Sequence, residues 1–461
     1  MLFNSFVFLG FLILTLALWN TLGPRARRVL LLVISYAFYA SWEPGFLLLL
    51  MFSTGLDFFV GRRLEAEARP DARKALLGLS LAGNLGLLFY FKYFLVLWDG
   101  LTGQGELQSQ IFHVEGYIPP GISFYTFQTL SYTIDVYRKK TRASRSLWDF
   151  AIFVSFFPQL VAGPIVRADE FMPQLAKNRR ASVPELIQGA ELFALGLFKK
   201  VVIADNVALA ADKVYGAPGE FTGASMVLAA VLFLVQVYCD FSGYSTMARG
   251  LARMFGFRLP KNFDYPWLAG DPLTYRRSWH ITMGNWFRDY VFRPLGGFRC
   301  HPVRGALNLM LVWALFGIWH GAGWNFLGWG LFNGAVQVTW RTLRQRGLVI
   351  PEFPGKYLAG CAFNFGIATV SVLIFRGEGI AETLTGLGRA FTLAADGKSL
   401  AVEWWGLFVV LALVHAACKR WYDEDLLNKL GWSGRAALLG GVALALLALS
   451  PEQRPFIYFQ F

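Results

Sequence analysis

The sequence contains little charge for its length. In 461 residues, Asp, Glu, Lys and Arg make up 16%, whereas an average soluble domain has about 25%. The four cysteines, Cys239, Cys300, Cys361 and Cys418, show no C-x-x-C spacing, which excludes the common zinc-site patterns and a readable disulfide framework. Low-complexity tracts, long linkers and repeats of about 20 to 50 residues are also missing. We therefore expect a single domain, 1–461, without a metal site.

Apolar residues fill the chain instead. Hydrophobic residues make up 55% of it and aromatic residues 16%, and the basic residues form short clusters between apolar runs. Such clusters are typical of loops beside a membrane, so the formal net charge of +13 does not indicate a nucleic-acid partner. The composition predicts an all-α integral membrane protein surrounded by membrane lipid.

The apolar runs predict about eleven transmembrane helices, each needing roughly 20 residues. We expect apolar segments at 2–22, 29–42, 46–60, 75–97, 119–137, 224–247, 306–319, 324–340, 357–375, 402–418 and 435–450. The stretch 186–204 is helix-like. Residues 148–166, interrupted by Pro158, Gly163 and Pro164, predict a re-entrant element. The segment 262–304 is rich in Trp, Tyr and Arg and is expected to lie in the interface.

Loop charges predict the orientation. The loop 99–118 holds Asp99, Glu106 and Glu115 but no Lys or Arg, whereas Arg138, Lys139 and Lys140 follow the next segment. Because inner loops are enriched in basic residues, the first loop should be external and the second internal. The first segment lacks a preceding basic residue and a small-residue cleavage site, as a retained anchor would. Both termini are then expected outside, in the periplasm.

His320 is the first candidate for chemistry. It lies in the apolar run Leu315–Trp324, and an ionisable residue at membrane depth is a functional candidate by default. Gly317, Gly321 and Gly323 leave room for close helix packing or for a substrate. The structural alternative is a core histidine bonded to a backbone carbonyl.

Several motifs resemble one family along nearly the whole chain. In order, they are Ile118-Pro119-Pro120-Gly121-Ile122-Ser123-Phe124-Tyr125, Ile134-Asp135-Val136-Tyr137-Arg138, Phe156-Phe157-Pro158-Gln159-Leu160-Val161-Ala162-Gly163-Pro164-Ile165, Tyr238-Cys239-Asp240-Phe241-Ser242-Gly243-Tyr244-Ser245, Arg276-Arg277-Ser278-Trp279-His280, Trp286-Phe287-Arg288-Asp289-Tyr290 and Trp319-His320-Gly321. Together they resemble the membrane-bound O-acyltransferases, and within them the bacterial branch that O-acetylates alginate. Pro119 departs from that pattern, in a position where the branch often has another apolar residue.

This resemblance implies a tunnel-containing membrane enzyme. It would transfer an acyl group, most often acetyl, from a cytoplasmic thioester such as acetyl-coenzyme A to an external hydroxyl, with no bound cofactor. By similarity His320 is the catalytic histidine and His280 the second histidine of the site. A neutral imidazole, with a pKa of about 6.5, suits general base catalysis. The implied partners are an extracytoplasmic SGNH or esterase-like acetyltransferase and a polysaccharide acceptor. The residues do not distinguish alginate, cellulose and peptidoglycan as that acceptor.

Further residues are candidates for the tunnel or the donor site. Arg276 and Arg277 could bind a donor phosphate, or serve topology alone. His280 lies in the same basic stretch with Asp289, where it could bind phosphate, orient His320 or anchor the segment to lipid headgroups. Asp240, Ser242 and Trp319 could line the tunnel, and the first two could equally form interhelical hydrogen bonds.

The C-terminal residues 456–461 carry an aromatic pattern, F-x-Y-x-x-F in form. It resembles the tyrosine motif of bacterial polysaccharide acylation systems, in which the phenol is proposed to receive the acyl group. We therefore expect Tyr458, at the external end of the chain, to act as an acyl relay. An aromatic membrane-interface belt is the structural alternative.

Two other classes of protein remain open from the residues. A transporter or flippase could use Lys199, Lys200 and His320 to line a path, although such proteins commonly show repeated halves, which we do not find. A scaffold that recruits an external acyltransferase is the other class, and the presence of both His280 and His320 argues against it.

Overall fold

The fold is built from helices. The structure is a computed structural model that describes residues 1–94, 98, 118–348, 353–377, 379–421, 430–451 and 454–457. The regular elements in these ranges are helical, apart from an isolated β-bridge between Phe221 and Lys398. The predicted loop 99–118 lies outside the described residues except for Ile118, so its external position stays a prediction.

Six helices in the described ranges are long and apolar enough to cross a membrane: α3 (Pro44–Ala66), α4 with η1 (Pro70–Phe94), α13 (Gly223–Met254), α16 (Pro302–His320), α18 (Lys356–Arg376) and α22 (Trp432–Leu449). The helix α1 (Phe6–Thr21) is apolar but shorter. The predicted class, an all-helical membrane protein, is thus confirmed. The predicted number of about eleven crossings goes beyond these six helices and stays a prediction.

The chain forms two compact units. Unit 1 comprises Met1–Leu197, Tyr244–Lys261 and Pro455–Phe461, and unit 2 comprises Phe198–Gly243 and Asn262–Arg454. The helix α13 begins in unit 2 and ends in unit 1. The expected single domain over 1–461 stays a prediction.

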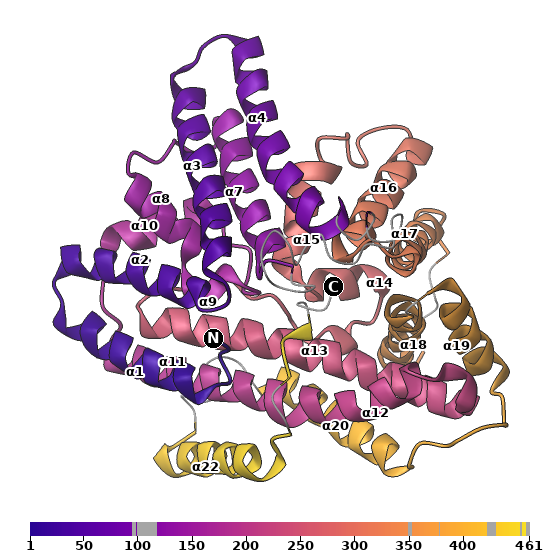
Figure 1. Cartoon of the computed structure of the whole chain (residues 1–461). Coiled ribbons are helices and arrows are strands. Elements are labelled where there is room, and N and C mark those ends of the chain that lie inside the picture. Colours follow the sequence, from indigo (N-terminus) through magenta and orange to yellow (C-terminus); the bar gives the residue numbers. More distant parts are fainter. Residues whose placement is uncertain are drawn as a thin grey trace. The chain divides into compact units, whose positions relative to one another are not determined.

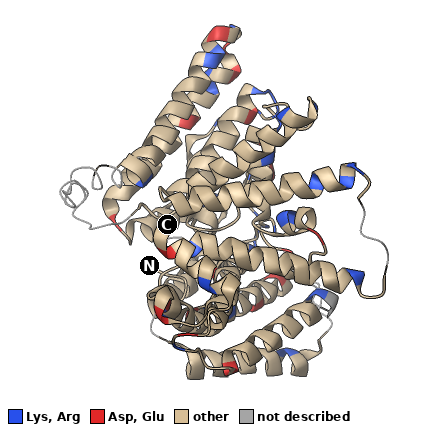
Figure 2. Ribbon diagram, turned by 90° about the vertical axis from the view of Figure 1, so that its right-hand side faces the viewer, with Lys and Arg blue, Asp and Glu red and all other residues tan. Residues whose placement is uncertain are grey.

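Unit 1 contains the N-terminal helices. In addition to α1, α3 and α4 it holds α2 (Pro24–Ala40), α7 (Ile122–Tyr137), α8 (Leu147–Ser155), α9 (Phe157–Leu160), α10 (Ala168–Lys177) and α11 (Val183–Leu197). The helices α3, α4 and α7 lie side by side (Figure 1). Their charged residues gather at the connection between α3 and α4 (Figure 2), where the chain leaves its apolar segments.

Buried polar side chains connect these three helices. Asp57 on α3 is fully buried and accepts hydrogen bonds from Asn84 Nδ2 on α4 and Thr133 Oγ1 on α7, each at 2.8 Å. Ser80 on α4 also donates to it. Because lipid offers no hydrogen bonds, polar groups between membrane helices bond to one another. The network therefore holds α3, α4 and α7 in one register.

The predicted re-entrant segment is a broken helix. The helix α8 ends at Ser155, Phe156 leaves the helical region with φ −48° and ψ 105°, and the short helix α9 follows with Pro158 in its first turn. Proline is tolerated there because its missing N–H would have no helical partner. The predicted interruption is confirmed, and its depth in a membrane stays a prediction.

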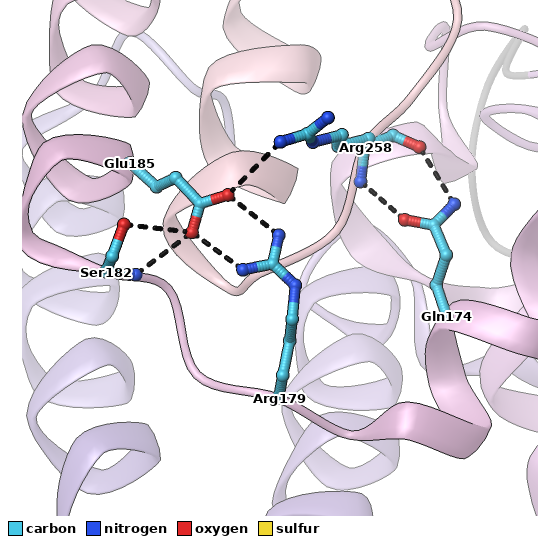
Figure 3. Close-up of polar contacts among 5 residues, drawn as sticks. All are labelled: Gln174, Arg179, Ser182, Glu185 and Arg258. Carbon is cyan, nitrogen blue, oxygen red and sulfur yellow. Dashed lines mark hydrogen bonds and ion pairs between the residues drawn. The ribbon is translucent and has the colours of Figure 1, made fainter.

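A polar cluster fixes the start of α11 in unit 1 (Figure 3). Ser182 and Glu185 have the capping-box spacing, and the Ser182 N–H donates to the Glu185 carboxylate at 3.0 Å. Arg179 donates to both oxygens of that carboxylate, at 2.7 and 2.8 Å. Gln174 exchanges hydrogen bonds of 3.1 and 2.8 Å with the backbone of Arg258. The helix α10 is thus tied to Arg258, in the segment 244–261.

Unit 2 contains the remaining helices. They are η2 (Phe198–Ala204), α12 (Asp205–Tyr215), η3 (Pro218–Glu220), the first part of α13, η4 (Pro266–Leu268), α14 (Pro272–Ser278), α15 (Ile281–Phe287), η5 (Arg288–Phe292), α16, α17 (Trp324–Gln345), α18, α19 (Ile380–Thr392), α20 (Glu403–Trp421) and α22. The segment 262–304 contains short helices and the first residues of α16, and its predicted position in the membrane interface stays a prediction.

Two glycines allow α16 and α17 to pack closely. A Cβ on Gly317 would lie 2.2 Å from the Phe326 carbonyl oxygen, and one on Gly330 would lie 2.3 Å from that of Trp313. Small residues at such positions let the backbones of membrane helices approach. The predicted packing role of Gly317 is confirmed, and this packing sets the position of His320 at the end of α16.

Candidate active site

His320 is the last residue of α16 and lies in a cluster of aromatic rings. It is 4% exposed. Its ring centroid lies 5.4 Å from Phe316 on the same helix, 5.1 Å from Trp329 on α17 and 5.0 Å from Phe375 on α18. Three helices therefore position one imidazole in an aromatic surrounding.

His280 lies in the same unit, at the N-cap of α15. It is 1% exposed and adopts the left-handed conformation, with φ 44°. A residue other than glycine rarely takes this conformation, which often marks a functional site. Its ring lies 4.6 Å from Phe241 on α13. The left-handed turn directs the chain from α14 into α15 at the position where His280 meets α13.

The structure brings the two predicted histidines to a shared pair of rings. The centroid of His280 lies 6.5 Å from Phe316 and 6.0 Å from Trp319, and that of His320 lies 5.4 and 4.7 Å from the same rings. Trp319 thus contacts both histidines. Its predicted place in the lining of a tunnel stays a prediction. The roles of the three residues stay predictions.

Arg276 lies on α14, one turn before His280, and has no acidic partner among the described residues. A Cβ on Gly284 would lie 1.9 Å from its Nη1, so the guanidinium rests on the Gly284 backbone. Burial, together with the charges of Arg288 and Arg277, lowers the pKa of Arg276 to about 10. Burial, and then the charge of Arg276, also lowers the pKa of His280 well below its usual value. His280 is therefore neutral at neutral pH.

Asp289 does not neutralise Arg276. Arg288 donates to both oxygens of the Asp289 carboxylate at 2.8 and 3.0 Å, and Arg293 Nη1 lies 2.9 Å from Oδ1. Arg276 makes no hydrogen bond or ion pair with the residues that the structure describes. Arg277 is exposed at the surface of the same short helix. Among the described residues, the arginines beside His280 therefore leave one partly buried positive charge, that of Arg276, without an anion.

Asp240 belongs to a buried ion-pair cluster. Lys200 Nζ lies 2.8 Å from Asp240 Oδ1 and 2.6 Å from Asp205 Oδ1, and the three side chains are at most 7% exposed. Lys200 lies in the π-helix η2, and such irregular turns are frequent at functional sites. Ser242 is also buried on α13. The sequence indicated Asp240 and Lys200 separately but did not pair them, and it missed Asp205.

A third buried histidine, His415 on α20, was not predicted as a site residue. Its ring centroid lies 4.7 Å from Trp267 and 5.2 Å from both Tyr238 and Tyr265. The signal that indicated His320, a lone histidine in an apolar run, is also present around His415. Applied evenly along the chain, that criterion would have found it.

The predicted relay residue, Tyr458, lies outside the described residues. Of the C-terminal pattern, Phe456 and Ile457 are described, and both are buried in unit 1. The Phe456 ring lies 4.9 Å from Tyr244. The described ranges contain no group of three or more His, Cys, Asp and Glu side chains arranged to hold a metal ion.

Helices of membrane-spanning length and a buried pair of histidines define a polytopic membrane protein with an internal site. Residues 85–346, which include His280 and His320, match the model of the membrane-bound O-acyltransferase family. The chain belongs to this family and is an acyltransferase. This finding favours the enzyme over the transporter.

The relatives include enzymes with different acceptors. The chain is 38% identical to "Probable alginate O-acetylase AlgI" of Pseudomonas putida, over 85% of this chain and 80% of that protein. It is 36% identical to the peptidoglycan O-acetyltransferase of Helicobacter pylori, over 71% and 66%. It is 26% identical to a teichoic acid D-alanyltransferase of Streptococcus thermophilus, over 56% and 68%.

Proposed function

We propose that the chain transfers an acetyl group from a cytoplasmic thioester to hydroxyls of alginate or a similar exopolysaccharide outside the bacterial inner membrane. The observation that carries the proposal is the convergence of His280 and His320 on Phe316 and Trp319, within the region that matches the family. The identity to an alginate O-acetylase over most of the chain supports the acceptor.

His320 acts as the general base in this proposal. Its imidazole takes the proton of the attacking hydroxyl, whose oxygen forms a bond to the acyl carbon. The carbon–sulfur bond then breaks, and the thiolate leaves with the proton that the imidazolium returns. The positive charge forms at the C-terminal end of α16, where the helix dipole is favourable to it. A base near its working pH is efficient in such a transfer.

His280 contributes a neutral imidazole. Because its pKa is lowered by burial and by Arg276, it donates or accepts hydrogen bonds without adding charge. It lies close enough to the rings around His320 to contact the same substrate. We place it beside the acyl donor, where it helps to orient the thioester.

Arg276 and Arg277 bind a phosphate of the donor in this proposal. A guanidinium without an acidic partner is costly to bury and binds phosphate through paired hydrogen bonds. Asp289 is occupied by Arg288 and Arg293, which supports Arg276 as the anion-binding residue. Trp319, Asp240 and Ser242 are proposed to line the route between donor and acceptor.

We also propose that Tyr458 carries the acyl group between the membrane site and an extracytoplasmic SGNH-type acetyltransferase. The phenol, with a pKa of about 10, forms an ester reactive enough for onward transfer, and a covalent relay divides one difficult step into two. The substitution Tyr458→Phe should then abolish labelling of the C-terminal peptide and acetylation of the polysaccharide, and thiol release should fall with them because the acyl group has lost its acceptor.

The test of the enzyme uses protein in nanodiscs with labelled acetyl-coenzyme A. Thiol release and the mass of the C-terminal peptide are compared for wild type, His320→Ala and His301→Ala. His301 is an exposed histidine at the opposite end of α16 and provides the matched control. Loss of release in His320→Ala alone supports the proposal. Equal release in all three proteins contradicts it and leaves a scaffold.

A second acceptor is favoured by one finding, the identity of 36% to a peptidoglycan O-acetyltransferase. The chemistry at His320 would be the same, and cellulose would be served in the same way. Incubation of membranes with alginate, cellulose and peptidoglycan fragments, followed by counting of bound label, distinguishes these acceptors.

A further inference from the structure

His415 presents a buried hydrogen-bond acceptor. Its side chain lies in the interior, and the residue is 7% exposed. The ring hydrogen-bonds the backbone of Tyr265, while Nε2 has no hydrogen-bond partner in the described chain. A neutral histidine that donates through Nδ1 carries its lone pair on Nε2. The imidazole therefore offers one acceptor that protein groups in these ranges leave unused.

Trp267 presents the complementary donor. Its indole ring centroid lies 4.7 Å from the His415 ring, and the residue is 8% exposed. The Trp267 Nε1–H also lacks a hydrogen-bond partner among the described residues. Buried polar atoms are nearly always hydrogen-bonded, so two unsatisfied atoms on adjacent rings require an explanation. One donor and one acceptor in the same cluster match a ligand group that has both.

The walls of this cluster are aromatic and fixed. Tyr238 on α13 lies 5.2 Å from His415 and 4.9 Å from Trp267. Tyr265 adopts the left-handed conformation, with φ 45°, which a residue other than glycine takes only where the surroundings impose it. A flat, neutral group with a donor and an acceptor fits such walls. A secondary amide has this chemistry.

The cluster is continuous with the candidate active site. From His415 the rings of Tyr238, Phe263, Phe241 and His280 follow one another, with successive centroid distances of 5.2, 5.7, 5.1 and 4.6 Å. These residues all belong to unit 2. An extended ligand could therefore lie along one aromatic wall with one end at His280 and another part at His415.

We propose that His415 and Trp267 form a subsite for a secondary amide of the pantetheine arm of the acyl donor. The proposal rests on the proposed function, because a thioester donor carries this arm whether the carrier is coenzyme A or an acyl carrier protein. The ligand amide N–H donates to His415 Nε2, and its carbonyl oxygen accepts from Trp267 Nε1–H.

The test compares donors that contain or lack the amides. Trp267→Phe and His415→Phe keep an aromatic ring and remove one hydrogen bond each. Trp432→Phe, at a tryptophan that is 76% exposed, is the matched control. KM and kcat are measured with acetyl-coenzyme A, S-acetylpantetheine and S-ethyl thioacetate, which has no amide. Binding of coenzyme A to each purified variant is measured in parallel.

We expect KM for acetyl-coenzyme A and S-acetylpantetheine to rise about tenfold in both variants, as for the loss of one hydrogen bond from a buried group. The values for S-ethyl thioacetate should not change, and coenzyme A binding should weaken in parallel. An acetylated carrier protein is tested beside acetyl-coenzyme A. The one with the higher kcat/KM identifies which molecule carries the pantetheine arm that the site uses.

Two outcomes overturn the inference. If activity falls equally with the amide-free thioester, His415 and Trp267 support the fold only. If no donor is affected, the two atoms bind water. A wild-type protein that transfers acetyl from none of these donors would instead overturn the proposed function, and the amide subsite with it.

Discussion

The guanidinium of Arg276 rests on the backbone of Gly284, on the turn of helix that follows His280. A methyl group at position 284 would lie 1.9 Å from Arg276 Nη1 and would displace the guanidinium, which can move because it ends a flexible side chain. Gly284→Ala should therefore raise KM for acetyl-coenzyme A about tenfold, as expected for a lost charge-assisted hydrogen bond, and should change thermal stability little.

The control for this change is Gly366→Ala on α18, where nothing lies within 4 Å of the new Cβ. It should leave KM unchanged. If Gly284→Ala leaves KM for the donor at the wild-type value, Arg276 does not bind the donor.

The buried cluster around Lys200 predicts a large loss of stability. Lys200→Met would leave Asp205 and Asp240 buried side by side without their cation. The free energy of unfolding should fall by about 3 to 5 kcal/mol, the usual cost of breaking a buried pair from one side. Thermal unfolding of the detergent-solubilised protein measures the change.

The comparison is an exposed ion pair of similar length. Lys398 Nζ lies 2.6 Å from Glu220 Oε2, and the two side chains are 68% and 59% exposed. Lys398→Met should lower the free energy of unfolding much less than Lys200→Met, because water and salt screen an exposed ion pair. Equal losses in the two variants would show that the Lys200 cluster adds no stability through burial.

His280 predicts a pH dependence of stability. Because its pKa is lowered in the folded protein, the unfolded chain takes up a proton below about pH 6.5, where the folded chain does not. The free energy of unfolding should therefore be independent of this residue above that pH and should fall as the pH falls below it. His280→Asn should remove this component of the acid sensitivity.

Unfolding curves for wild type, His280→Asn and His301→Asn between pH 7.5 and pH 5 provide the measurement, with these limits chosen to lie about the imidazole pKa. The exposed His301 should give curves parallel to wild type. An unchanged acid slope in His280→Asn would contradict the prediction.

Glu185 predicts the opposite kind of contribution at the start of α11. Its hydrogen bonds with Arg179 and Ser182 lower the pKa of its carboxyl, so its contribution is complete above the unfolded-state pKa of about 4.3. The contribution is lost as the pH falls through the lower, folded-state pKa. Glu185→Gln should cost about 1 to 2 kcal/mol at neutral pH, a typical value for a lost helix cap.

Arg258→Gln is the control, since Arg258 lies 3.6 Å from Glu185 and its side chain is 71% exposed. It should change the unfolding temperature less than Glu185→Gln does. Persistence of the Glu185→Gln difference after full acid titration would show that the carboxylate charge is not its source.

The predicted apolar segments were found as helices where a local pattern determines them, but an apolar run does not show how far its helix continues. The predicted segment 224–247 is the core of α13, but the helix continues to Met254. Arg249 and Arg253 end the apolar run, yet arginine is a good helix former, so the helix does not end with it. The π-helix η2 could not be predicted from its amino-acid composition, because the extra residue in its turn depends on the side chains that pack beside it.

The sequence by itself determined the helical membrane class and marked His320, because long apolar runs and a lone ionisable residue within one are local properties of the chain. The tertiary structure alone brought His280 and His320 to the same two rings, paired Lys200 with Asp240 and placed His415 against Trp267. The physical reason is that the pattern of apolar side chains shows which face of a helix is buried but not which other helix packs against that face. Those neighbours are decided by the close packing of helices such as α16 and α17, through contacts between distant residues.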